Sequence, residues 1–104
     1  MIIRIATDFT ETPGARYRVE GDFSGEEFRE EILEPKFLEA KGVGEKLTID
    51  LDGGYGYPTS FLEEAFGGLA RKYGATSVSA VLVFISRDEP SLIDEILEYI
   101  VSQR

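Results

Sequence analysis

The chain has 104 residues, of which 42% are hydrophobic and 30% charged, a composition that predicts one globular domain with a single core. Its formal net charge of −9 disfavours sequence-independent nucleic-acid binding, because such binding neutralises phosphates with Lys and Arg. The absence of Cys and His excludes a disulfide framework, a thiolate metal site and the usual residues of zinc sites and general bases. No apolar run approaches the ~20 residues that span a bilayer and no targeting leader is recognisable, so we expect a cytoplasmic protein with no membrane partner.

The first half of the chain predicts two strands followed by a helical region. Three isoleucines within residues 2–5 indicate a strand that ends near residues 7 and 8, and a Pro-Gly turn follows. Residues 16–20 alternate arginine with Tyr and Val, which predicts a second strand and therefore a hairpin. Ser24 and Glu27 have the spacing of a capping box, so a helix is expected to begin there. Pro35 either ends this helix near residue 33 or begins a second helical segment that reaches residue 42.

The stretch 47–74 predicts a strand, a glycine-rich loop and an amphipathic helix. Apolar side chains alternate in residues 47–51, as in a strand with one face more deeply buried. Three glycines and a proline break the chain at residues 53–58. Ser60 and Glu63 form a second capping-box pattern, and Gly74 is placed to end the helix that follows.

The last quarter of the chain predicts a strand and a helix. Residues 78–85 form the most apolar run, which is typical of a parallel strand buried on both faces. Asp88, Glu89 and Pro90 are start signals for a final helix with an apolar stripe. The predicted order is β-β-α-β-α-β-α, an α/β fold in which helices pack on a small mixed sheet, all within a single domain over residues 1–104.

The sequence Asp50-Leu51-Asp52-Gly53 is the strongest enzyme-like signal. It resembles the first motif of haloacid-dehalogenase-type phosphotransferases, in which two aspartates flank one residue at the end of a strand. That resemblance implies that Asp50 attacks phosphorus, that Asp52 acts as acid or base, and that Mg²⁺ binds between them. A receiver-type acidic pocket, with Asp8 beside either aspartate, is a related alternative. The simpler alternative is that acidic residues and glycine end the strand and open the turn.

Two glycine-containing segments are candidate partner-binding surfaces. The loop carries two tyrosines, side chains enriched at interfaces, and its candidate residues are Gly53, Gly54, Tyr55, Gly56 and Tyr57. The alternative is that these tyrosines fold back over the edge of the core. The pair Gly67 and Gly68 lies in the middle of a helix, where each glycine costs about 1 kcal/mol relative to Ala. A helical wheel puts Gly67 on the polar face, which predicts an outer surface that a partner's backbone approaches closely, or else an intramolecular contact.

Arg16 and Arg18 share one face of the predicted second strand, and Arg4 on the neighbouring strand could extend the group. Guanidinium groups suit the recognition of carboxylates and phosphates, so Arg16 and Arg18 are candidate anion-binding residues. The alternative is that they pair with nearby glutamates on a solvated face.

Over nearly its whole length the chain resembles a family of STAS-like domains of unknown function. The matching residues are Pro13-Gly14-x-Arg16, Gly21, Ser24-Gly25-Glu26-Glu27-Phe28-Arg29, Asp50-Leu51-Asp52-Gly53, Tyr55-Gly56 and Ser60-Phe61-Leu62-x-Glu64-Ala65-Phe66-Gly67-Gly68-Leu69. The central unit also resembles the STAS fold of anti-sigma-factor antagonists, in which a partner kinase phosphorylates a serine at the start of a helix. On that pattern Thr59 and Ser60 align with the hydroxyl pair, while Pro58 replaces the aspartate and Phe61 the glycine. The resemblance therefore implies Thr59 and Ser60 as phosphoacceptor candidates, although a serine at this place is more often a helix cap.

Together these observations predict a non-enzymatic, STAS-like regulatory module that needs no cofactor. It would bind a protein through the loop of residues 53–60 and the outer face of the helix that follows. The resemblance implies an ATPase-type kinase or another regulator as the partner. A magnesium-dependent phosphotransferase that uses Asp50 and Asp52 is the alternative, and a structural subunit that forms homo-oligomers is a third hypothesis.

Overall fold

The computed structural model describes residues 1–103 and contains a three-stranded, fully parallel sheet. The strands are β1 (Ile2–Arg4), β2 (Leu47–Asp50) and β3 (Leu82–Ile85), and they lie in the order β1-β2-β3. Side chains alternate between the two faces of the sheet, and Ile3 and Ile49, which are partners in register, are buried on the same face.

A long helix connects β1 to β2. It follows a short helix, α1 (Ile5–Asp8), and a 3₁₀ turn, η1 (Arg18–Glu20), and consists of α2 (Gly25–Phe28), η2 (Arg29–Leu33) and α3 (Glu34–Val43). Ser24 begins this helix as predicted, because its side chain accepts a hydrogen bond from the Glu27 N–H. Gly44, with a φ of 72°, ends it.

A second long helix leads from β2 towards β3 and consists of α4 (Thr59–Leu62), η3 (Glu63–Gly67) and α5 (Gly68–Tyr73). Both η2 and η3 are π-helical turns within otherwise α-helical segments. Gly74 ends α5 with a φ of 93°, as predicted, and α6 (Ala75–Val81) then leads into β3. The last element is α7 (Ser91–Val101).

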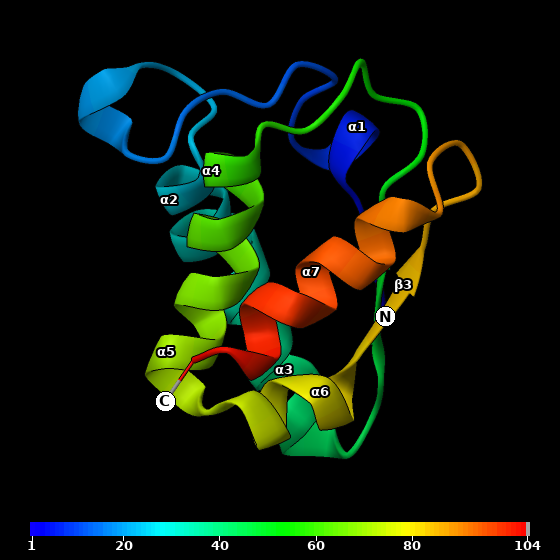
Figure 1. Ribbon diagram of the computed structural model, residues 1–104. Coiled ribbons are helices and arrows are strands. Elements are labelled where there is room, and N and C mark those ends of the chain that lie inside the picture. Colours follow the sequence, from blue (N-terminus) through cyan, green and yellow to red (C-terminus); the bar gives the residue numbers. More distant parts are fainter. Residues whose placement is uncertain (104) are drawn as a thin grey trace.

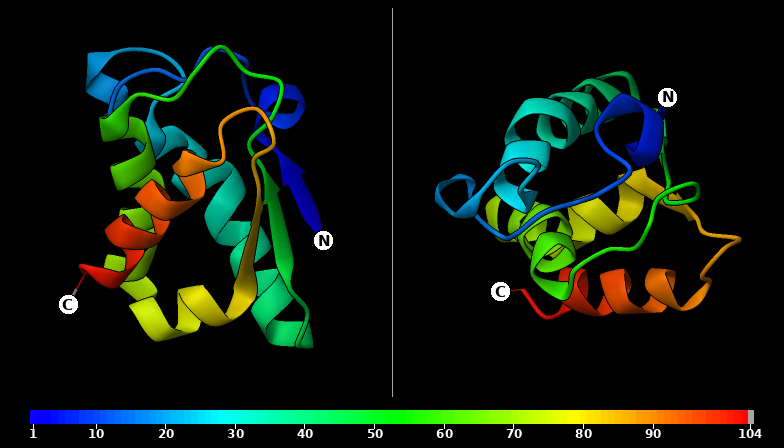
Figure 2. Two further views of the ribbon diagram at one scale, coloured as in Figure 1. Left: turned by 45° about the vertical axis from the view of Figure 1, so that its right-hand side comes forward. Right: turned by 90° about the horizontal axis from the view of Figure 1, so that it is seen from above.

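Helices α2 to α7 all lie on one side of the sheet (Figures 1 and 2). The core fills the space between these helices and the inner face of the sheet. Its largest fully buried side chains are four phenylalanines, Phe28, Phe37, Phe61 and Phe66. The other face of the sheet has no helix over it (Figure 2). No helix within residues 1–103 combines the length and the apolar character that crossing a membrane requires.

The predicted strand at residues 16–20 is wrong, and with it the hairpin and the mixed sheet. These residues form a loop that ends in η1. Glutamate side chains hold its backbone, because the N–H of Tyr17 donates to Glu20 Oε1 and the N–H of Arg18 to Glu26 Oε1, both at 2.9 Å. The carboxylates thus supply the hydrogen-bond acceptors that a neighbouring strand would otherwise provide.

Three other boundaries differ from the prediction. β1 already ends at Arg4, whose N–H donates to Asp8 Oδ2 at 2.8 Å as the chain turns into α1. The helix does not stop or restart at Pro35, because it passes through the proline with the π-helical turn η2 immediately before α3. Only the second half of the apolar run 78–85 is a strand, and the first half belongs to α6. β3 lies at the edge of the sheet with Val83 43% exposed, so the predicted burial on both faces is wrong.

Candidate functional site

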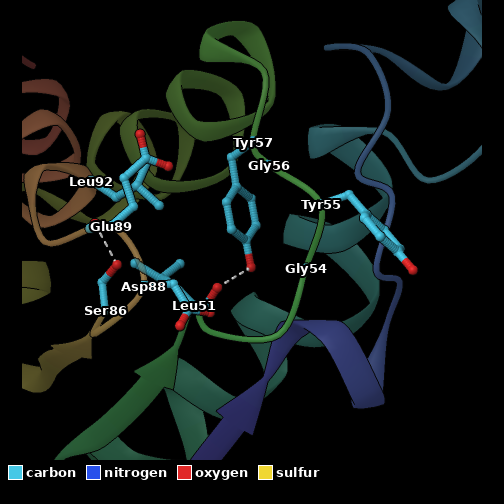
Figure 3. Close-up of a pocket in the computed structure, with 9 residues that line it drawn as sticks. All are labelled: Leu51, Gly54, Tyr55, Gly56, Tyr57, Ser86, Asp88, Glu89 and Leu92. Atoms are coloured by element: carbon cyan, nitrogen blue, oxygen red, sulfur yellow. Dashed lines mark hydrogen bonds between the residues drawn. The ribbon is translucent and has the colours of Figure 1, made fainter.

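The recognition loop, residues 53–60, begins just beyond the carboxyl end of β2 and reaches the start of α4. In open α/β sheets, ligands bind at the carboxyl ends of the strands. The recognition loop lies at this end of the sheet, next to the loop between β3 and α7 (Figure 3).

Three carboxylates fix the start of the recognition loop, and two of them join it to the loop between β3 and α7. Asp50 Oδ1 accepts a hydrogen bond from the Asp52 N–H at 3.0 Å. Asp52 Oδ1 accepts from the N–H groups of Arg87 and Asp88, at 2.8 and 2.9 Å. Asp88 Oδ2 in turn accepts from the Gly53 N–H at 3.1 Å. The recognition loop therefore starts from a fixed position.

Tyr55 and Tyr57 point in different directions (Figure 3). Tyr57 is half-buried and its hydroxyl donates to the Leu51 carbonyl at 2.9 Å. Burial and the nearby charges of Asp50 and Asp52 raise the pKa of Tyr57, so its phenol stays protonated and keeps this hydrogen bond. Tyr55 is 83% exposed, although its backbone N–H is fixed by the Glu11 carbonyl at 2.9 Å. Tyr57 thus folds back over the core, and Tyr55 is displayed.

A cavity of about 200 Å³ lies between the recognition loop and the start of α7. Its lining comes from both loops: Leu51, Gly54, Tyr55, Gly56, Tyr57, Ser86, Asp88, Glu89 and Leu92. The Ser86 hydroxyl donates to the Glu89 carbonyl at 2.6 Å, so its proton is used within the chain. The cavity is small, and its polar groups serve mainly to hold the two loops together.

Asp50 and Asp52 both accept hydrogen bonds from backbone N–H groups. Each uses one carboxylate oxygen to fix a turn, as the simpler alternative predicts. Within residues 1–103, no group of three or more Asp or Glu side chains is arranged to hold a metal ion. Asp8 lines a different cavity, beside Ile2 and Pro35, so the geometry gives the receiver-type pocket no support. The phosphotransferase stays a prediction without support from this geometry.

Thr59 and Ser60 are the first two residues of α4. Thr59 is exposed and Ser60 half-buried. The predicted capping box at Ser60 is wrong, because Pro58 is the residue that caps the helix, and its carbonyl accepts from the N–H groups of Phe61 and Leu62. Thr59 therefore presents its hydroxyl at the N-terminus of the long helix 59–73, where the helix dipole favours negative charge.

The predicted glycine surface at Gly67 and Gly68 does not exist, because both residues are buried. A Cβ at Gly68 would lie 2.8 Å from the Nε of Arg29, and one at Gly67 would lie 2.6 Å from an oxygen of Glu63. The intramolecular alternative therefore describes this pair, since glycine makes room for charged side chains that pass between the helices.

These charged side chains form an ion-pair cluster between the two long helices: Arg16, Arg29, Glu34, Glu63, Glu64, Arg71 and Lys72. Arg29 is the central cation, 3.0 Å from Glu64 and 3.2 Å from Glu34. Its Nε is buried and has no hydrogen-bond partner among the described residues. The sequence analysis did not identify this cluster. Its signals in the sequence were the alternative that pairs Arg16 with glutamates, and Glu64, which lies next to buried apolar positions of its helix.

Arg16 and Arg18 pair with glutamates, as the alternative to anion binding predicts. Arg16 pairs with Glu63, which raises the pKa of its guanidinium, and lies 3.7 Å from Glu64. Arg18 lies 2.8 Å from Glu31 and 3.4 Å from Glu30. Both guanidinium groups are therefore engaged within the chain, and residues 16–20 do not form the strand beside β1 that would have brought them next to Arg4.

Residues 24–92 match a family model described as a STAS-like domain of unknown function (DUF4325). The matched segment runs from the N-cap of α2 to the start of α7 and so includes β2, β3, the recognition loop and most of the ion-pair cluster. Neither the curated proteins nor the solved structures contain a significant match to the chain.

Proposed function

The chain belongs to the family of STAS-like domains of unknown function, and on this premise we propose that it is a regulatory module that binds a protein and carries out no catalysis. The exposure of Tyr55 on a fixed backbone is the observation that carries the proposal. The contact surface is the recognition loop, with Tyr55 as its anchor and Thr59 as the residue that controls binding.

A tyrosine on a fixed loop is well suited to binding. Aromatic residues are enriched among the side chains that dominate binding energy at interfaces. Tyr55 keeps 83% of its surface in solvent, whereas its neighbour Tyr57 fastens the loop to the end of β2. Because the backbone is already ordered, binding loses less conformational entropy than it would with a mobile loop.

In this proposal Thr59 controls the contact. Its hydroxyl is exposed four residues after Tyr55, at the N-terminus of a helix, where a phosphate would be stabilised by the helix dipole. On α7, Tyr99 lies beside Thr59 and donates to Glu95 at 2.6 Å. A phosphate on Thr59 would bring roughly two negative charges next to this pair and so change the surface around the recognition loop. By analogy with anti-sigma-factor antagonists, an ATPase-type kinase is the enzyme we expect to add it.

The test is quantitative mass spectrometry on tagged protein recovered from its native cells, with three versions compared. We expect Tyr55→Ala to lower the recovery of a specific partner by about ten-fold or more, as for a central interface residue. Val19→Ala is the matched control, because Val19 is 92% exposed and lies outside the recognition loop. Equal recovery with Tyr55→Ala and with Val19→Ala would contradict the proposed surface.

The same spectra test the control by phosphate. We expect a phosphate on the peptide that contains Thr59, and its loss in Thr59→Val but not in Ser60→Ala. If Thr59 carried no phosphate either in protein that is bound to the partner or in protein that is free of it, control by phosphorylation would be wrong. The proposal that Tyr55 anchors a partner would then stand on its own result.

A further inference from the structure

The outer face of the sheet has no helix over it and exposes apolar side chains. We call it the open face and define it by Ile2, Arg4, Lys46, Thr48, Asp50, Val83 and Ile85. Ile2, Thr48 and Val83 are partners in register and so form a row across all three strands. The two outer members of the row are 38% and 43% exposed, although their strand neighbours Ile3 and Leu82 are buried.

An uncovered parallel sheet is unusual. All-parallel sheets occur almost only where helices cover both faces, because their strands are joined by crossover helices. In this chain both crossovers lie on the same side (Figure 2), so the sheet keeps one apolar face in solvent. Covering this face would remove Ile2 and Val83 from water and complete the second layer that parallel sheets normally have.

We propose that a second copy of this chain covers the open face, with a two-fold axis along the row Ile2–Thr48–Val83. In such a dimer the two sheets stack face to face, with their strands antiparallel across the interface and about 10 Å between the sheets. The apolar row of one copy then lies on the same row of the other. A two-fold contact uses the same patch twice, so this patch must be complementary to itself.

A two-fold axis at the row would place opposite charges of the two open faces against each other. Thr48 and Asp50 are alternate residues of β2 and share one face, and Lys46, which directly precedes the strand, continues the same alternation. Because Thr48 is the middle one, a two-fold axis at Thr48 brings Lys46 of each copy opposite the partner's Asp50. Within residues 1–103, neither Lys46 nor Asp50 is in an ion pair: the Lys46 ammonium donates to the Ala80 carbonyl and Asp50 Oδ1 accepts from the Asp52 N–H, so no opposite charge neutralises either group.

The charge of the whole chain favours the open face over other contacts between copies. With a net charge of −9, two copies repel each other over most of their surfaces. The open face instead carries two cations, Arg4 and Lys46, and one anion, Asp50. It is also separate from the recognition loop, so a failed test of either proposal leaves the other unaffected.

Sedimentation velocity over a range of concentrations tests the dimer. We expect the unmodified chain to reach twice the monomer mass, and Thr48→Arg to shift the dissociation constant by about ten-fold or more towards monomer, because it buries a charge on the axis. Lys46→Glu should also weaken the dimer, since it places like charges opposite each other, and adding Asp50→Asn should restore part of the loss. Asn keeps the oxygen that accepts from the Asp52 N–H. Lys41→Glu, an equal charge change at an exposed position of α3, should leave the dimer unchanged.

Thiol cross-linking tests the position of the axis. The chain has no Cys, so a single introduced Cys reports only on its own surroundings. Two facing Cys residues on sheets about 10 Å apart lie beyond the Cα separation that a disulfide bridges. We therefore expect a short bifunctional thiol reagent to cross-link Thr48→Cys faster than Val19→Cys, although Val19 is far more exposed. A chain that stays monomeric up to about 1 mM would overturn the proposal. So would a dimer that Thr48→Arg and Lys46→Glu leave intact, because its contact would lie elsewhere.

Discussion

Between the two long helices charged side chains are buried, whereas on the open face of the sheet apolar side chains are exposed. Glu64 is 6% and Glu34 8% exposed inside the ion-pair cluster, while Ile2 and Val83 remain 38% and 43% exposed on their strands. Both regions thus reverse the usual distribution of residue types. In this chain, burial depends on where the crossover helices lie and on whether each buried charge has a partner.

The two regions also differ in what they leave available for binding. In the ion-pair cluster nearly every charged group has a partner in the same chain, and buried glycines let the side chains pass. The open face has apolar area and two charged residues, Lys46 and Asp50, that form no ion pair within residues 1–103. A self-contained cluster fixes how two helices pack, and an incomplete surface can bind a further molecule. The following predictions test this distinction.

The largest difference is expected between the two faces of the sheet. Ile49→Ala should lower the free energy of unfolding by about 3 kcal/mol, because it leaves a cavity at a fully buried position of β2. Val83→Ala on β3 should lower it by less than about 1 kcal/mol in solutions dilute enough to dissociate the proposed dimer. Urea titrations of both variants measure the difference. Equal losses would mean that the open face is already covered within one chain.

A comparable effect is expected when the ion-pair cluster loses its central anion. Glu64→Ala should cost about 3 kcal/mol, because the Arg29 guanidinium stays buried after its closest carboxylate is removed. Glu30→Ala is the control, since Glu30 pairs with Arg18 at the surface and such pairs contribute less than about 1 kcal/mol. Urea titrations of both variants measure the difference. Equal denaturant midpoints would mean that the ion-pair cluster does not contribute to stability.

The sequence predicts best those elements that depend on local pattern. The strand, glycine break and helix of residues 47–74 were correct, because alternation, glycine and helical spacing act over a few residues. The apolar run 78–85 was half wrong, since a buried helix and a buried strand give the same pattern over four residues. Arginine and apolar side chains alternate in residues 16–20 as in a strand. The backbone is held instead by the side chains of Glu20, at the end of this segment, and of Glu26, outside it.

The candidate site depends on contacts that local pattern does not contain. The wheel placed Gly67 on a polar face but could not show that Glu63 and Gln103 lie over it, or that the next residue, Gly68, packs against Arg29 of another helix. Likewise, the sequence pattern predicts a binding role for both tyrosines of the recognition loop. Only the fold distinguishes Tyr57, whose hydroxyl donates to the Leu51 carbonyl, from Tyr55, which is exposed.

A smaller effect is expected where backbones meet within the helical layer. A Cβ at Gly25 would lie 2.6 Å from the Phe61 carbonyl oxygen, so Gly25→Ala must push α2 away from α4. The cost should be about 2 kcal/mol, in the range for overpacked cores. Gly42→Ala in α3 meets nothing within 4 Å and should instead stabilise the chain by up to about 1 kcal/mol. Thermal midpoints that move in the same direction would contradict the close approach.

The smallest effect is expected from acid, through two carboxylates of the ion-pair cluster. Burial opposes the charged form of Glu34, but hydrogen bonds from Lys72 and Tyr73 outweigh it and lower its pKa below the ordinary value of 4.5. Hydrogen bonds from Arg71 and Arg16 outweigh burial and lower the pKa of Glu63 in the same way. The unfolded chain therefore binds protons first, so this stabilisation is complete above the ordinary pKa and is lost as pH falls through the lower folded values.

Thermal midpoints measured from about pH 7 down to about pH 3 should accordingly fall at the acid end. Glu34→Gln removes one of the two carboxylates and should make this fall shallower. Glu30→Gln is the control, because it changes the net charge by the same amount but lies outside the ion-pair cluster. Removing any negative charge from a chain of net charge −9 reduces repulsion, and this control measures that general effect. If the thermal midpoints of Glu34→Gln and Glu30→Gln changed equally with pH, the acid response would come from the total charge of the chain. The ion pairs of the cluster would then make no contribution of their own to it.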